Sequence, residues 1–163
     1  MIPTKDHQVN LQTLLYTGMR YVECQRFKEH PDWFDISTGF ITLPKGASLK
    51  VQARQKERWI RLSAQGKMMV PIYLITNTDL PSKITWRENL RRWGEKAGLE
   101  PDGLCPKTTR KTYESWLSFY YGLRPEILQS QGHTEKVSIE HYLGLPFTEQ
   151  DKVDMRFFVE GWI

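Results

Sequence analysis

Basic side chains and a late tyrosine follow one another at defined spacings along the chain. Lys107 and Arg110 lie three positions apart, and Arg20 comes directly after a Thr-Gly-Met segment near the N-terminus. His133 follows a glycine, and Tyr142 comes nine positions after His133. Arginines can hold the non-bridging oxygens of a phosphodiester, a tyrosine oxygen can attack its phosphorus, and a lysine or histidine can protonate the leaving group. These residue types are sufficient to attack a phosphodiester without a metal.

The order and spacing of these residues resemble the catalytic domain of the tyrosine recombinases, the phage-integrase and Xer-like enzymes that exchange DNA strands. The resemblance extends from about Val9 to the C-terminal helix. Its most specific parts are the segment TGMRYVE, the 23 residues from Arg110 to His133, and the nine from His133 to Tyr142. It implies a mixed α+β fold, mainly α-helical, with a small three-stranded antiparallel sheet.

The resemblance implies a role for each of the five residues. Tyr142 would attack a DNA phosphate, form a 3′-phosphotyrosyl link and release a 5′-hydroxyl. Arg20 and Arg110, together with Lys107 and His133, would stabilise the charge that develops on the phosphate. Because the covalent link conserves the phosphodiester energy, the 5′-hydroxyl of another strand can reverse the step, and neither a cofactor nor a metal is required.

The segment between the second and third predicted strands carries several lysines. In the resembled family, a lysine of this hairpin is the general acid that protonates the 5′-oxygen. Lys50 matches that residue best by its position after the second strand, and Lys56 is the alternative because it lies close to the third. A lysine on a flexible stem that loses its proton on desolvation suits this role.

Lys107 departs from the usual family pattern, which has a histidine three positions before the second arginine. Some integrases of archaeal viruses and plasmids have a lysine at this place, so the change is compatible with activity. A lysine can donate hydrogen bonds to the phosphate, but it is a poorer general base at neutral pH than a histidine. His133 or water would then accept the proton of Tyr142.

The composition is that of a globular protein of 163 residues with a net charge of +4, from 23 basic and 19 acidic side chains. Cys24 and Cys105 have no metal-type neighbours and are expected to be free thiols in a reducing compartment. There is no apolar run of membrane-spanning length and no secretion signal, which favours an intracellular protein. We expect one catalytic domain over residues 1–163, without the N-terminal DNA-clamping domain of related full-length enzymes.

Three short aromatic or β-branched segments, separated by turn residues, predict the antiparallel strands WFDIS, GFITLP and RWIRLS. Helical spacing of apolar residues predicts helices over residues 7–18 and 21–30, with Arg20 in the first turn of the second. Residues 67–76 are largely apolar and fit either a buried helix or a strand; the resemblance implies a helix.

Two further helices are predicted in the middle of the chain. The first has Ser82 as its N-cap and presents a buried side with Ile84, Leu90 and Trp93. Its other side is a basic face that is either solvated or in contact with the DNA backbone, made of Arg87, Arg91, Arg92 and Lys96. The second helix has Pro106 in its first turn and places Lys107 and Arg110 on one face.

The C-terminal segment is predicted to form an amphipathic helix with four apolar side chains, Val153, Phe157, Phe158 and Trp162. This helix needs a surface on which to bury them. It could fold back on its own domain, or it could dock on a neighbouring subunit, as the resemblance implies for an assembly on DNA.

Several alternatives remain open at this point. A type IB topoisomerase shares the same chemistry, although the small size and the short spacing before Tyr142 favour a recombinase. The segment 125–143 also resembles a helix-turn-helix, with its turn at Gly132, and could belong to a non-catalytic DNA-binding module. Arg20 could simply pair with Glu23. In the favoured interpretation the partner is double-stranded DNA, and Arg110→Ala should abolish cleavage while leaving the fold intact.

Overall fold

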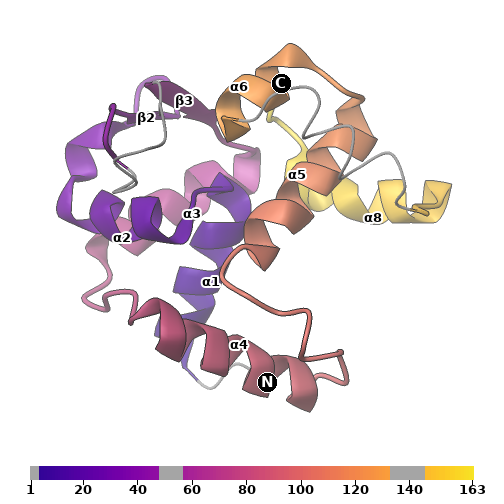
Figure 1. The fold of residues 1–163 in the computed structure, drawn as a ribbon. Helices are drawn as coiled ribbons and strands as arrows, with labels where there is room; N and C mark the ends of the chain where they lie inside the picture. The colour runs from indigo at the N-terminus through magenta and orange to yellow at the C-terminus, as the bar shows by residue number, and fades with distance from the viewer. Residues whose placement is uncertain (1–3, 48–56, 133–145) are drawn as a thin grey trace.

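The computed structural model describes residues 4–47, 57–132 and 146–163. In these residues the chain is mainly helical, with one small sheet, as the sequence predicts (Figure 1). The helices are α1 (Lys5–Thr17), α2 (Tyr21–Glu29), α3 (Ala64–Ile75), α4 (Lys83–Lys96), α5 (Thr108–Tyr121), α6 (Pro125–Gln131) and α8 (Glu149–Val159), with a short 3₁₀ helix η1 (Pro31–Trp33). The strands are β1 (Phe34–Asp35), β2 (Phe40–Leu43) and β3 (Arg58–Arg61).

The three strands form an antiparallel sheet in the order β1-β2-β3, which confirms the prediction. Strand β2 ends at Leu43, which pairs with Arg58 at the start of β3. Side chains alternate along β3, so that Arg58 and Ile60 are buried while Trp59 is exposed. An arginine therefore occupies a strand position that faces the core.

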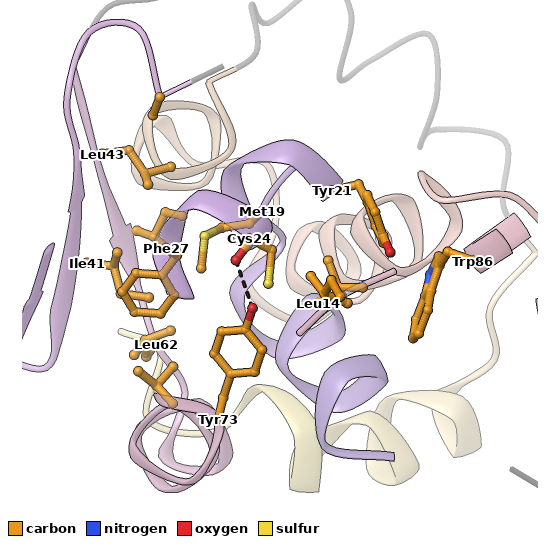
Figure 2. Packing of buried hydrophobic residues seen from close by; sticks show 14 of the residues in the cluster. Leu14, Met19, Tyr21, Cys24, Phe27, Ile41, Leu43, Leu62, Tyr73 and Trp86 are labelled. Atoms are coloured by element: carbon orange, nitrogen blue, oxygen red, sulfur yellow. Dashed lines mark hydrogen bonds between the residues drawn. The ribbon is translucent and has the colours of Figure 1, made fainter. Parts of the chain in front are cut away.

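The larger hydrophobic core lies between the sheet and the first four helices (Figure 2). Phe27 of α2, Ile41 of β2 and Tyr73 of α3 are fully buried in it, and Tyr73 donates a hydrogen bond of 2.8 Å to the backbone carbonyl of Cys24. Trp86 of α4 packs edge-on against Trp93 at the other end of this core. Full burial of each large apolar side chain contributes roughly 1.5–3 kcal/mol.

A second, smaller core joins the end of α1 to α5, α6 and α8. Tyr113 and Leu117 supply it from α5, Ile127 from α6 and Val159 from α8. In Figure 1, α5 crosses the middle of the molecule with α6 and α8 beside it. Helix α5 thus connects the part of the molecule that carries the sheet to the C-terminal part.

Local signals explain where several helices begin and end. Ser82 caps α4 by accepting a hydrogen bond of 3.2 Å from Thr85 N, as predicted. Helix α1 ends at Gly18, which adopts the left-handed conformation with φ of 60°. Helix α3 forms although it contains Pro71, because Val70 and Tyr73 bury its inner face in the core.

Two details of the predicted helices were wrong. Ile84 was predicted to be buried but is 73% exposed, and Trp86, two positions later, is buried in the core instead. Arg20 lies at the N-cap of α2 and not in its first turn. Both differences place a side chain one or two positions away from the expected one.

The C-terminal helix α8 folds back on its own domain. The Tyr121 hydroxyl donates to Val159 O at 2.7 Å, Ala64 N donates to Glu160 O at 2.9 Å, and Trp162 Nε1 donates to Arg61 O at 3.0 Å. Of its predicted apolar residues, Val153 and Phe157 are exposed, by 65% and 60%. None of the described helices is both long and apolar enough to cross a membrane.

Candidate active site

The carboxylate of Glu23, in the first turn of α2, is fully buried and accepts four hydrogen bonds. Arg20 supplies two of them, from its backbone N to Oε2 and from Nη1 to Oε1, both at 2.8 Å. Arg58 supplies the other two, from Nη1 to Oε1 at 2.9 Å and from Nη2 to Oε2 at 2.7 Å. A carboxylate offers about four lone-pair positions. Glu23 is therefore saturated, and it fixes two arginines at once.

Arg58 is a residue of this site that the sequence analysis did not identify. It is 6% exposed, and its Nε donates a further hydrogen bond of 3.1 Å to Ser130 O in α6. It thereby connects β3 to the start of α2 and to the end of α6. A charged residue in alternation with Trp59 and Ile60 on a short strand was the signal in the sequence that could have indicated it.

Arg110 lies in the first turn of α5 and is also only 6% exposed. Its Nη1 donates to Gly18 O at 2.6 Å, and its Nη2 donates to Gln131 O. It therefore ties the end of α1, two residues before Arg20, to the end of α6. Two of the predicted phosphate-binding arginines, far apart in the sequence, are brought to the same junction of helices.

Burial and the neighbouring charges of Arg58 and Arg20 lower the pKa of Arg110 to about 10. The pKa of Arg110 still lies well above neutral pH, so the guanidinium keeps its charge. The carboxylates of Glu23 and of the buried Glu114 act on this pKa in the opposite direction, so three arginines face two carboxylates at this junction. Such a cluster suits the binding of a phosphate.

Arg20 differs from the two buried arginines because 38% of its side chain is exposed. Its pairing with Glu23, left open by the sequence, is confirmed. Of its side-chain nitrogens, only Nη1 bonds to Glu23. Within the described part of the chain, Nε and Nη2 of Arg20 have no hydrogen-bond partner. Arg20 is therefore held in place while part of its guanidinium can still bind a ligand.

Lys107 makes no side-chain contact with this network among the described residues. Helix α5 begins at Thr108, so Pro106 and Lys107 precede the helix and do not lie in its first turn as predicted. Lys107 is exposed whereas Arg110 is buried, and no hydrogen bond or ion pair joins Lys107 to the other described site residues. Lys107 is the N-cap of α5 and has helical backbone angles, and its carbonyl accepts a hydrogen bond of 3.0 Å from Lys111 N.

The remaining predicted site residues, Lys50, Lys56, His133 and Tyr142, lie outside the described residues. Gly132 is the last described residue before His133, and its φ of 64° is left-handed. A Cβ added at Gly132 would lie 3.1 Å from Cδ of Arg58. The backbone that leads to His133 is thus packed directly against the arginine network.

The backbone at Gly18 is equally constrained, and Gly18→Ala should lower the free energy of unfolding by roughly 1–2 kcal/mol, the cost of a left-handed conformation for a residue with a Cβ. Its φ is 60°, and the added Cβ would lie 2.5 Å from Oε1 of the buried Gln131. Urea unfolding of the two proteins measures this difference. Gly103→Ala, with open space around the added Cβ, is the control; an equal loss there would contradict the account.

Acid should weaken the Glu23 network. Burial alone would raise the pKa of Glu23, but the charge and hydrogen bonds of Arg58, followed by those of Arg20, outweigh burial and hold it below its usual value. The unfolded chain then binds the proton more tightly than the folded one, so ionised Glu23 stabilises the fold above about pH 4.3 and this contribution is lost as the pH falls through the folded pKa.

We therefore expect the free energy of unfolding to decrease below about pH 4.3, and to decrease less steeply in Glu23→Gln. Urea unfolding at a series of pH values measures both slopes. Asp151→Asn, which removes an exposed capping carboxylate of lowered pKa, leaves the Glu23 contribution in place and is the control. Parallel slopes for the wild type and Glu23→Gln would show that Glu23 is not the group responsible.

Comparison with known proteins adds a structural relative. No protein-family model and no curated protein matches the chain. Among solved structures, it is similar to the Tn1549 transposon integrase, residues 82–397, in complex with circular intermediate DNA. The chain has the fold of a tyrosine recombinase catalytic domain. The TM-score is 0.62 at 14% identity, over 94% of this chain and 57% of that one, so the likeness establishes the fold alone.

Two further observations concern the extent of the match and the side chains that could hold a metal. This chain spans 57% of the length of the integrase chain. Within the described residues there is no group of three or more histidine, cysteine, aspartate or glutamate side chains placed to hold a metal ion. Cys24 and Cys105 are both free thiols, as predicted.

Proposed function

We propose that the chain is the catalytic domain of a site-specific DNA recombinase that cleaves and rejoins strands through a 3′-phosphotyrosyl intermediate. The observation that carries this proposal is the gathering of Arg20 and Arg110 around one junction of helices, in a fold shared with a DNA-bound integrase. Arg110 is buried and donates to two backbone carbonyls, whereas Arg20 is anchored by one side-chain nitrogen and is partly exposed. Two cations held in this way suit the non-bridging oxygens of one phosphate.

In the proposed reaction, the Tyr142 hydroxyl oxygen forms a bond to phosphorus and the bond from phosphorus to the 5′-oxygen breaks. His133 or water accepts the tyrosine proton, and Lys50, or alternatively Lys56, gives a proton to the leaving 5′-oxygen. Arg20 and Arg110 stabilise the extra negative charge of the five-coordinate phosphate. Attack by the 5′-hydroxyl of another strand reverses each transfer and restores the tyrosine.

Lys107 would donate a hydrogen bond to the same phosphate in place of the usual histidine, as in some integrases of archaeal viruses and plasmids. Its exposed position before α5 supports a role in contact with a ligand. Lys107 takes no part in accepting the tyrosine proton in this reaction, because a lysine is a poorer general base than a histidine at neutral pH.

The proposed partner is double-stranded DNA carrying recombination sites, inside the cell, with residues 1–163 acting as one catalytic domain. The exposed basic side chains of α4 would contact the DNA backbone. Copies of the chain would associate on DNA through α8, whose exposed Val153 and Phe157 provide an apolar surface for contact.

A covalent trapping assay tests the proposal. The protein is incubated with nicked suicide duplexes that carry candidate recombination sites, and adducts that resist SDS are detected, with Tyr142→Phe as the matched variant. We expect an adduct that is lost in Tyr142→Phe. Duplex binding without any adduct, unchanged in Tyr142→Phe, would instead support a non-catalytic DNA-binding module.

A further inference from the structure

The third arginine of the site, Arg58, has no role in the proposed chemistry. We infer that Arg58 is a positioning residue that satisfies Glu23 and thereby leaves Arg20 available to a phosphate. The inference rests on the proposed function of Arg20 as a phosphate ligand. It assigns Arg58 no contact with DNA.

The lone pairs of Glu23 are shared between Arg58 and Arg20. Arg58 forms a two-nitrogen fork that takes one position on each oxygen, at 2.9 Å and 2.7 Å. The backbone and Nη1 of Arg20 take the other two, at 2.8 Å each. With all four positions filled, a second nitrogen of Arg20 has no acceptor on Glu23. The fork of Arg58 therefore limits Arg20 to a single side-chain bond.

Arg58 also neutralises the charge of Glu23. Arg58 and Glu23 are 6% and 0% exposed, and together they form a buried pair with no net charge. The positive charge of Arg20 then remains available to a phosphate. Without Arg58, the carboxylate of Glu23 would be balanced by Arg20, whose guanidinium could rotate to form the two-nitrogen fork itself. The phosphate would lose both a charge and a hydrogen-bond donor.

The contacts of Arg58 favour a positioning role over direct contact with a ligand. Each of its three side-chain nitrogens already donates, Nε to Ser130 O and the other two to Glu23. Its side chain is 6% exposed, and a Cβ added at Gly132 would lie 3.1 Å from its Cδ. We therefore expect the effect of Arg58 on the reaction to act through Glu23 and Arg20.

The test compares Arg58→Met with the double variant Arg58→Met/Glu23→Gln in the suicide-duplex assay, at saturating DNA. In Arg58→Met the unpaired carboxylate captures Arg20, and the adduct should form about 100-fold more slowly, the loss typical for one donor to a transition-state oxygen. In the double variant the carboxylate charge is absent, and the rate should return to within about tenfold of the wild type. Arg58→Lys, which keeps the charge but not the fork, should fall between the two.

A double variant as slow as Arg58→Met, with both proteins folded, would overturn the inference, since removing the carboxylate charge would then have failed to release Arg20. If Arg58→Met does not fold, the double variant alone decides the question. A rate within about tenfold of the wild type supports the inference, and a loss of about 100-fold overturns it.

A spectroscopic measurement separates this inference from the proposed function. The NMR signal of the Arg20 Nε–H group is followed as inorganic phosphate is added. It should shift in the wild type and in the double variant but not in Arg58→Met, whether or not an adduct forms. If these shifts are observed but the wild type forms no adduct, the proposed reaction is rejected and the role of Arg58 is kept. If the wild type forms an adduct but these shifts are not observed, the proposed reaction is kept and the role of Arg58 is rejected.

Discussion

Arg110→Lys should lower the rate of covalent adduct formation about 100- to 1000-fold, the loss expected when a fixed donor to a transition-state oxygen is removed. The guanidinium of Arg110 reaches Gly18 O and Gln131 O with two nitrogens while it remains charged. A lysine carries the same charge but cannot reproduce that fork, so the charge moves away from the phosphate.

Single-turnover trapping at saturating duplex measures this loss. Lys111→Ala removes the adjacent, exposed cation of α5 and is the matched control, for which we expect a change of less than about threefold. Equal rates for Arg110→Lys and the wild type would remove Arg110 from the reaction. Lysine is preferable to alanine here: Arg110→Ala would leave two buried carbonyls without donors, at roughly 1–3 kcal/mol each, whereas the sequence alone suggested an intact fold.

Arg58→Met should lower the free energy of unfolding by about 3–5 kcal/mol, because it leaves the carboxylate of Glu23 buried without its main partner. The side chains of both residues are almost fully excluded from solvent, and four hydrogen bonds converge on Glu23. The substitution also frees Ser130 O in α6. The loss would therefore reach the sheet, α2 and α6 together.

Urea unfolding at neutral pH measures this loss. Arg58→Met/Glu23→Gln should recover part of it, because the buried charge is gone, and Arg87→Met on the exposed face of α4 should change the free energy of unfolding by less than about 0.5 kcal/mol. A loss below about 1 kcal/mol for Arg58→Met would show that the fork of Arg58 contributes little to stability.

Much of the fold follows from local signals in the sequence. Ser82 and Gly18 mark helix ends by side-chain capping and by a left-handed conformation, and both were predicted. The three strands were predicted from their β-branched and aromatic residues. Such features depend on neighbours within a few positions, which the sequence displays directly. The fold class implied by the resemblance is also confirmed.

The network around Glu23 could not be predicted in the same way. Its central contact joins Glu23 to Arg58, 35 positions later, and a second joins Arg58 to Ser130, 72 positions later. The alternation along the third strand could indicate that Arg58 is buried, but no local pattern indicates its partner, because that partner is distant in the sequence. Ile84 and Trp86 show the same limit: both fit an apolar helix, and only the packing of Trp86 against Tyr21 decides which one is buried.

The central claim is that Tyr142 becomes covalently joined to DNA. The most direct measurement is mass spectrometry of the trapped adduct after nuclease and protease digestion. The account predicts a peptide that contains Tyr142 and carries a nucleotide through its 3′-phosphate. A nucleotide attached to another residue, or attached through its 5′-phosphate, would contradict it.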